Sequence, residues 1–203
     1  EKGIPIISSE GCRTYLKDNG HEEFDRLTKR SPELAERFPD MKLTFPHITF
    51  SEGTTIHLPG VTVHVSYRAH NGHSHSRGDS IAMVEGEDIL FAGDLLYTEV
   101  HPVCFFGIIP NWLVSLDGLL DLSFSKVVPG HGPSVDGEEE GKRHFRKLSG
   151  YLEDLYGNLC DAKAGRKTPA QVADHMTSGD YTSLGKVRMV QRNIDHFLKG
   201  SCT

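Results

Sequence analysis

The chain has 203 residues, of which 37% are hydrophobic and 25% are charged, and its formal net charge is -6. These values are ordinary for one soluble domain that buries a core of its own. No run of Lys and Arg offers a basic face to nucleic acid. No apolar stretch reaches the roughly 18 residues that a membrane span needs.

The cysteines and the start of the chain leave the cellular compartment open. Cys12, Cys104, Cys160 and Cys202 are widely scattered and form no C-x-x-C pair, so a structural zinc knuckle is not expected. Nothing in their positions demands a disulfide. The first residue is Glu1, and the sequence shows no signal or transit pattern.

Apolar runs and helix signals alternate in the first part of the chain. Residues 4–7 predict a short buried strand. The helix that follows is expected to end at Asn19-Gly20. A second helical stretch over residues 22–30 is expected to restart at Ser31-Pro32, because proline fits the first turn of a helix.

A β-rich block comes next. Residues 54–58 are strand-like, Pro59-Gly60 predicts a turn, and residues 61–65 alternate between apolar and polar side chains. Residues 81–84 and 89–92 predict a second hairpin, because an acidic turn with a central glycine separates them.

The apolar spacing then becomes helical. Asn111 is a candidate cap for a helix that reaches residue 120, and residues 127–128 predict a short strand. Residues 145–159 have the three-four spacing of an amphipathic helix, and Thr168-Pro169 begins another. Residues 187–197 predict the last helix. Strands followed by helix, strand and helices indicate an α/β or α+β fold.

Three short motifs, each after a predicted strand, carry the residues suited to chemistry. They read Gly-His-Ser-His-Ser-Arg-Gly-Asp at residues 72–79, Phe-Ala-Gly-Asp-Leu-Leu at 91–96 and Val-Val-Pro-Gly-His-Gly-Pro at 127–133. Glycines beside a ligand let the backbone approach closely. Histidine and carboxylate ligands suit Zn²⁺, Fe or Mn²⁺, and the two oxygens of an Asp can bridge two ions.

Each motif taken singly has an ordinary structural interpretation. A Gly-His-Gly segment is equally well a turn with a solvated His, and Asp after an apolar run commonly starts a turn. His73 and His75 would share one face of an extended strand, although two surface histidines are the commoner case. Together and in this order, the three motifs indicate a metal site.

The order H-x-x-G-D, F-x-G-D and P-G-H-G resembles the metallo-β-lactamase superfamily. The resemblance is to its broad branch of β-lactamase-like hydrolases, which includes proteins of the sulfur-oxidation and quinoprotein-relay type, and it extends over nearly all of residues 1–160. It implies an α/β (α+β) fold, the αββα sandwich, with the N-terminal part missing from this chain. Residues 1–203 would form a single partial domain in which residues 163–203 are a C-terminal helical extension.

The resemblance also implies roles for individual residues. His75, which lies four residues before Asp79 as in H-x-x-G-D, would bind the first metal. Asp94 would bridge the two metals, His131 would bind the second, and Asp79 would orient a ligand or a loop. The residues expected to line the pocket near the metals are Tyr97, His101 and Trp112. Positions in the core or at the rim are an equally weighted alternative for these three.

One departure from the family pattern is important. The signature H-x-H-x-D-H, which supplies histidine ligands and a proton-handling Asp, does not occur in the chain. Residues 73–79 resemble it superficially, but their Asp comes two residues late and no His follows. The signature and the catalytic Asp are therefore expected upstream of Glu1. The chain alone is expected to bind metal weakly and to be nearly inactive, unless its own N-terminal segment or a second copy completes the site.

The implied function is that of a metal-dependent hydrolase. Two divalent metal ions, with zinc expected first and iron or manganese as alternatives, would activate water against an ester, lactam, thioester or related small-molecule substrate. One rival is a mononuclear-iron sulfur oxidoreductase of the same fold. The other is a non-catalytic fragment or pseudoenzyme. Metal analysis of the intact protein separates these interpretations.

Overall fold

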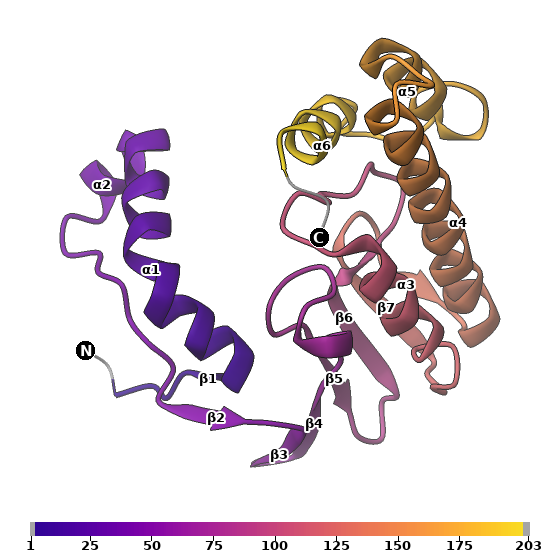
Figure 1. The fold of residues 1–203 in the computed structure, drawn as a ribbon. Helices are drawn as coiled ribbons and strands as arrows, with labels where there is room; N and C mark the ends of the chain where they lie inside the picture. The colour runs from indigo at the N-terminus through magenta and orange to yellow at the C-terminus, as the bar shows by residue number, and fades with distance from the viewer. Residues whose placement is uncertain (1–2, 201–203) are drawn as a thin grey trace.

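The computed structural model describes residues 3–200, and Cys202 lies outside the described residues. Figure 1 shows an N-terminal segment of strands and helices on one side, a sheet in the middle, and helices packed beside the sheet. In chain order, the elements are β1 (Ile7–Ser9), α1 (Glu10–Arg30), α2 (Pro32–Arg37), β2 (Ile48–Phe50), β3 (Gly53–Leu58), β4 (Val61–Tyr67), η1 (His70–Gly72), β5 (Ser80–Val84), β6 (Ile89–Tyr97), α3 (Ile109–Asp117), β7 (Lys126–His131), β8 (Val135–Asp136), α4 (Glu138–Lys163), α5 (Pro169–Met176), η2 (Gly179–Tyr181) and α6 (Arg188–Lys199).

The larger sheet has six strands in the order β3-β4-β5-β6-β7-β8. Neighbouring strands are antiparallel except β6 and β7, which run parallel. Gly60 and Gly86 lie in the tight connections of the two hairpins and have φ values of 80° and 83°, which glycine adopts without steric cost. Because β6 and β7 are parallel, their carboxyl ends meet at one edge of the sheet.

Helices α3 and α4 contact this sheet and form the core with it. Phe145, Leu152 and Leu155 recur on one face of α4 and are fully buried, which confirms the predicted amphipathic helix. Trp112 of α3 is also fully buried. Helices α5 and α6 pack against α4 and against each other, away from the N-terminal segment (Figure 1).

The N-terminal segment forms a separate small sheet, in which β1 and β2 pair in parallel. The prediction that Asn19-Gly20 ends the first helix is wrong, because α1 continues to Arg30. Gly20 is the buried residue of α1, and a Cβ there would lie 3.1 Å from Cδ2 of Leu43. The glycine therefore allows close packing of the segment after α2 and does not cap the helix.

Other boundaries also differ from the sequence predictions. The first strand comprises Ile7–Ser9 instead of residues 4–7, and β7 continues through the Pro-Gly pair to His131. Asn111 is not the cap of α3, because the helix begins at Ile109, and the Asn111 side chain instead donates to the carbonyl oxygen of His73 at 3.0 Å. The two-residue strand β8 was not predicted. Two residues are too few to show a strand pattern, and the Pro and Gly residues on either side of β8 indicate a turn.

Cys12, Cys104 and Cys160 are free thiols. Within residues 3–200, no helix is long and apolar enough to cross a bilayer.

Candidate metal centre

The three predicted metal ligands lie at the edge of the sheet where β6 and β7 end. Asp94 belongs to β6, and His131 is the last residue of β7. The register of this pair shifts on both sides of Gly93, and such a bulge re-aims the neighbouring side chains. His75 reaches the same place from the loop between η1 and β5. Residues distant in sequence are thus brought together by one pair of parallel strands and one loop.

The Asp94 carboxylate lies between the two imidazole rings. Its Oδ2 is 3.9 Å from Nε2 of His75, and its Oδ1 is 3.8 Å from Nε2 of His131. His75 is buried, whereas the side chains of Asp94 and His131 are 40% and 39% exposed. The cluster is therefore open to solvent from the side of His131 and closed behind His75.

The donor spacing fits two metal positions, one on each oxygen of Asp94. Zinc binds nitrogen and oxygen ligands at about 2.0–2.2 Å, so two donors of one ion lie at most about 4.4 Å apart. Both Asp94–His distances are within that limit. Each position has two protein donors, and residues 3–200 contain no group of three or more His, Cys, Asp or Glu that could hold one metal ion.

The ring of His75 is held on three sides. Tyr97 Oη lies 3.2 Å from Nε2, Asp79 Oδ1 lies 3.8 Å from Nδ1, and the Trp112 ring packs edge-on at 4.9 Å between centroids. Asp79 in turn accepts hydrogen bonds from the backbone N–H and the hydroxyl of Ser76. The carboxylate favours a proton on Nδ1 and leaves the Nε2 lone pair directed toward Asp94.

Tyr97 connects the two histidines. Its hydroxyl is at His75 Nε2, and its ring centroid is 5.1 Å from that of His131. Burial and the nearby negative charge of Asp94 raise the pKa of Tyr97 far above its usual value. The phenol therefore remains protonated and acts as a hydrogen-bond donor at the centre of the cluster.

Trp112 and His101, the other two predicted pocket residues, are both fully buried. Trp112 packs behind His75, and its Nε1 donates to the Leu95 carbonyl oxygen at 3.1 Å. His101 lies deeper, with Nδ1 2.9 Å from the Tyr151 hydroxyl, and burial lowers its pKa. Tyr97, the third predicted pocket residue, lines a cavity.

Two further residues, Gly130 and Lys186, shape the site. Gly130 packs so closely on Asp94 that an added Cβ would collide with Oδ1 and lie 2.8 Å from the Asp94 backbone nitrogen. Lys186, from the loop before α6, places Nζ 2.9 Å from Nδ1 of His131. The sequence carries no signal for the Lys186 contact, because lysine in a polar loop is ordinary. His73 lies apart, with Nε2 2.6 Å from the Phe106 carbonyl oxygen.

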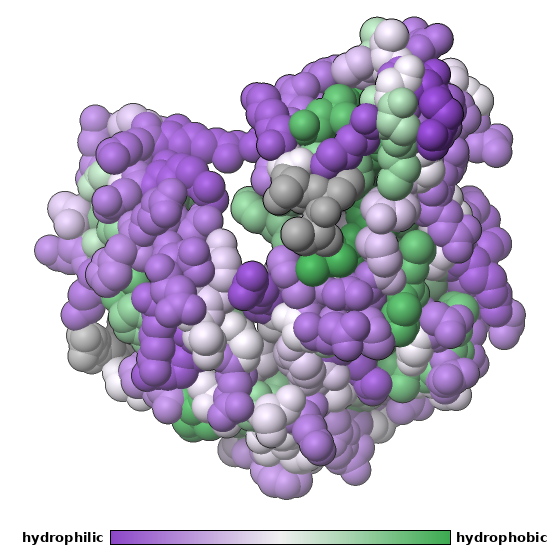
Figure 2. All heavy atoms as spheres, viewed as in Figure 1, coloured by the Kyte–Doolittle hydropathy of each residue, from purple (hydrophilic) through white to green (hydrophobic). Residues whose placement is uncertain are grey.

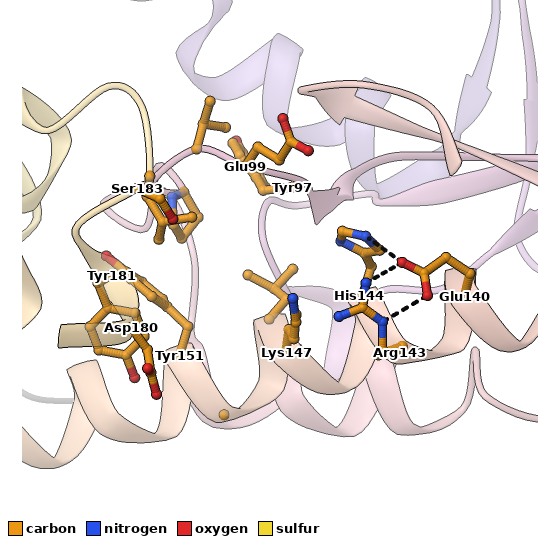
Figure 3. Close-up of a pocket in the computed structure, with 15 residues that line it drawn as sticks. Tyr97, Glu99, Glu140, Arg143, His144, Lys147, Tyr151, Asp180, Tyr181 and Ser183 are labelled. Atoms are coloured by element: carbon orange, nitrogen blue, oxygen red, sulfur yellow. Dashed lines mark hydrogen bonds and ion pairs between the residues drawn. The ribbon is translucent and has the colours of Figure 1, made fainter. Parts of the chain in front are cut away.

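A cavity of about 890 Å³ opens beside Tyr97 (Figure 3). It lies between the loop after β6, one face of α4 and the loop around η2. The α4 side presents charged groups, and Glu140 there pairs with Arg143 and His144. The opposite walls carry Glu99 and Tyr181. A ligand in this cavity would meet both signs of charge next to the histidine–carboxylate cluster.

Comparison with solved structures identifies the fold. A metallo-beta-lactamase from Pontibacter korlensis matches 75% of this chain at 18% identity and a TM-score of 0.56. A metallo-beta-lactamase family protein from Thermus thermophilus matches 97% at 18% identity and a TM-score of 0.59. A sec-alkyl sulfatase matches 75% at 10% identity and a TM-score of 0.55. The chain therefore has the metallo-β-lactamase fold, as the motif order predicted.

The chain corresponds to part of these structures. It covers 59% of the Pontibacter protein, 66% of the Thermus protein and 26% of the sulfatase. No protein-family model matches the sequence.

Proposed function

We propose that the chain forms part of a metal-dependent hydrolase in which His75, Asp94 and His131 hold two divalent ions. The observation that supports this most is the placement of the Asp94 carboxylate, with one oxygen toward each histidine Nε2 at 3.8–3.9 Å. A carboxylate in this position is suited to bridging two ions. The solved proteins of this fold include metallo-beta-lactamases and an alkyl sulfatase, which agrees with hydrolysis without specifying a substrate.

Each residue of the cluster would have a separate role in metal binding or catalysis. His75 would bind one ion through Nε2, while Asp79 fixes its ring from behind. His131 would bind the other ion at the solvent-exposed side. Two bound ions supply a water nucleophile at neutral pH and polarise the bond to be cleaved. The Tyr97 hydroxyl, directed into the cluster, would donate a hydrogen bond to an oxygen of the substrate.

The cluster also indicates what else the site needs. A catalytic zinc ion usually has three protein ligands and an open position, whereas each position here has two donors. We propose that water and donors from a partner, such as a second copy of the chain, complete the coordination. The substrate would be a small molecule, an ester, lactam, thioester or related compound, that enters beside Tyr97.

Metal analysis combined with a hydrolysis panel tests this function. After incubation with zinc and dialysis, the protein whose coordination such a partner completes is expected to retain two zinc ions per chain and to cleave at least one ester, thioester, lactam or sulfate ester, whereas the isolated chain should bind metal weakly. Asp94→Ala should lose metal and turnover together while it keeps the wild-type circular dichroism spectrum. One iron per chain with persulfide oxidation would replace this proposal by the oxidoreductase, and no retained metal would indicate a non-catalytic protein.

A further inference from the structure

Lys186 brings a positive charge to the cluster without an acidic partner. Its Nζ lies 2.9 Å from Nδ1 of His131. Within residues 3–200, no Asp or Glu oxygen lies within 4.0 Å of this ammonium group, the limit for an ion pair. Several charged side chains near the cavity are paired, as Glu140 is with Arg143. Lys186 is thus a positively charged group held against a predicted metal ligand.

The backbone holds Lys186 in a strained conformation. Its φ is +58°, in the left-handed region that costs a non-glycine residue free energy. Glu99, on the facing loop, also has a φ of +58°. Gly185 lies between them, donates to the Glu99 carbonyl oxygen and accepts from the N–H of His101, both at 2.9 Å. Strain of this kind, held in place by surrounding bonds, is typical of functional sites.

Metal binding to His131 would release the Lys186 side chain. An ammonium group only donates hydrogen bonds, so its contact with Nδ1 requires a lone pair on that nitrogen. A histidine that binds a metal through Nε2 carries its proton on Nδ1 and has no lone pair there. The two contacts exclude each other. With metal bound, the ammonium must leave His131, while its backbone stays fixed by Gly185.

We propose that Lys186 anchors an anionic group of the substrate, a carboxylate, phosphate or sulfate, beside His131. This inference rests on the proposed function, because the released ammonium would lie next to bound cations. An anion between them would satisfy both charges, whereas a neutral group would leave the ammonium without a counter-charge. The adjoining cavity offers room for the rest of such a substrate, and Ser183 and Leu184 of the same loop line it (Figure 3).

Binding of inorganic phosphate to the zinc-loaded protein is the first test, measured by isothermal titration calorimetry. Lys186→Met should weaken phosphate binding by about tenfold or more, the size expected for one charge-assisted hydrogen bond. Lys186→Arg should stay within about threefold of wild type, because it keeps the charge. Lys199→Met removes the same charge from the last turn of α6 and should have no effect. Wild-type affinity in Lys186→Met, or no phosphate binding by the wild-type protein, would overturn the proposal.

Nitrogen NMR of the histidine rings provides a readout that needs no activity. In the metal-free protein, His131 should carry its proton on Nε2 and accept at Nδ1, and zinc should move the proton to Nδ1. In the Lys186→Met protein, the His131 ring should no longer favour a proton on Nε2 over one on Nδ1. A metal-free His131 already protonated on Nδ1 would contradict the Lys186 contact.

The proposed hydrolase function and the proposed role of Lys186 can be refuted independently of each other. Lys186-dependent phosphate binding without any hydrolysis would refute the function alone, and hydrolysis with phosphate binding indifferent to Lys186 would refute the anchor alone.

Discussion

At the scale of single residues, the candidate centre depends on groups that hold ligands in place as much as on the ligands. His75 is packed between Trp112 and Tyr97, and Asp79 lies behind its Nδ1. These contacts favour the ring orientation in which Nε2 is directed at Asp94. His131 has less support, since it is partly exposed and contacts the end of the long Lys186 side chain.

Removing the charge of Asp79 should weaken metal binding without unfolding the protein. Asp79→Asn keeps the size of the side chain but loses the carboxylate that polarises His75. Loss of a group of this kind typically costs about 10–100-fold in metal affinity. Zinc affinity is measured by competition with a chromophoric chelator.

The matched control is Asp174→Asn, an exposed position in α5. Equal zinc affinities for wild type and Asp79→Asn would show that Asp79 only stabilises its own loop, by accepting hydrogen bonds from Ser76.

At the scale of elements, the parallel pair of β6 and β7 creates the cluster. Gly130 lies at a close approach of these strands, against Asp94 and the preceding backbone. The strand ends therefore tolerate no side chain at this position. In the motif at residues 127–133, His131 thus faces the cluster and Gly130 lets the neighbouring strand approach.

Gly130→Ala should destabilise the fold and disturb the centre together. The added methyl group must displace Asp94 or separate the strands, and such overpacking costs about 1–3 kcal/mol. Urea denaturation gives the change in the free energy of unfolding, and chelator competition gives the zinc affinity.

Gly157→Ala provides the control, because a Cβ in this exposed position of α4 meets nothing within 4 Å. It should stabilise the helix by up to about 1 kcal/mol. A Gly130→Ala protein as stable as wild type, with unchanged zinc affinity, would refute the close-approach argument.

Local patterns predicted the longer strands and the main helices, because period-two alternation and three-four spacing are set by burial on one face, whereas the short strands β2 and β8 were not predicted. The fold was predicted from the resemblance of the three motifs to a known superfamily. It failed at Asn19-Gly20, where tertiary packing of Leu43 against the glycine overrides a local stop signal. The convergence of His75, Asp94 and His131 followed from motif order. The contact between Lys186 and His131 could not be predicted, since it depends on the conformation of a loop 55 residues after His131.

At the scale of the whole molecule, the N-terminal segment leaves apolar side chains uncovered. Within residues 3–200, its two-stranded sheet pairs with no further strand, and several large apolar residues are exposed, for example Ile4 at 70% and Phe38 at 49%. Figure 2 shows this segment beside the main body with a gap between them on the displayed face. Exposed apolar groups and open strand edges promote association.

We therefore expect the chain to self-associate as its concentration rises. Sedimentation velocity should show a growing dimer fraction at micromolar concentrations. Replacing the exposed Ile48 of β2 by Lys should reduce association, because a charge at a strand edge opposes pairing.

Val187, exposed to a similar extent near α6, is the control, and Val187→Lys should leave association unchanged. A chain that remains monomeric throughout, or an Ile48→Lys protein that associates like wild type, would rule out this surface as the contact between copies.

Anomalous X-ray scattering from zinc-soaked crystals would show whether Asp94 bridges two metal ions between His75 and His131. We expect two anomalous peaks, one on each side of the Asp94 carboxylate, each about 2.0–2.2 Å from a carboxylate oxygen and from one histidine Nε2. A zinc peak elsewhere, a single peak that does not touch Asp94, or no peak at saturating zinc would contradict it.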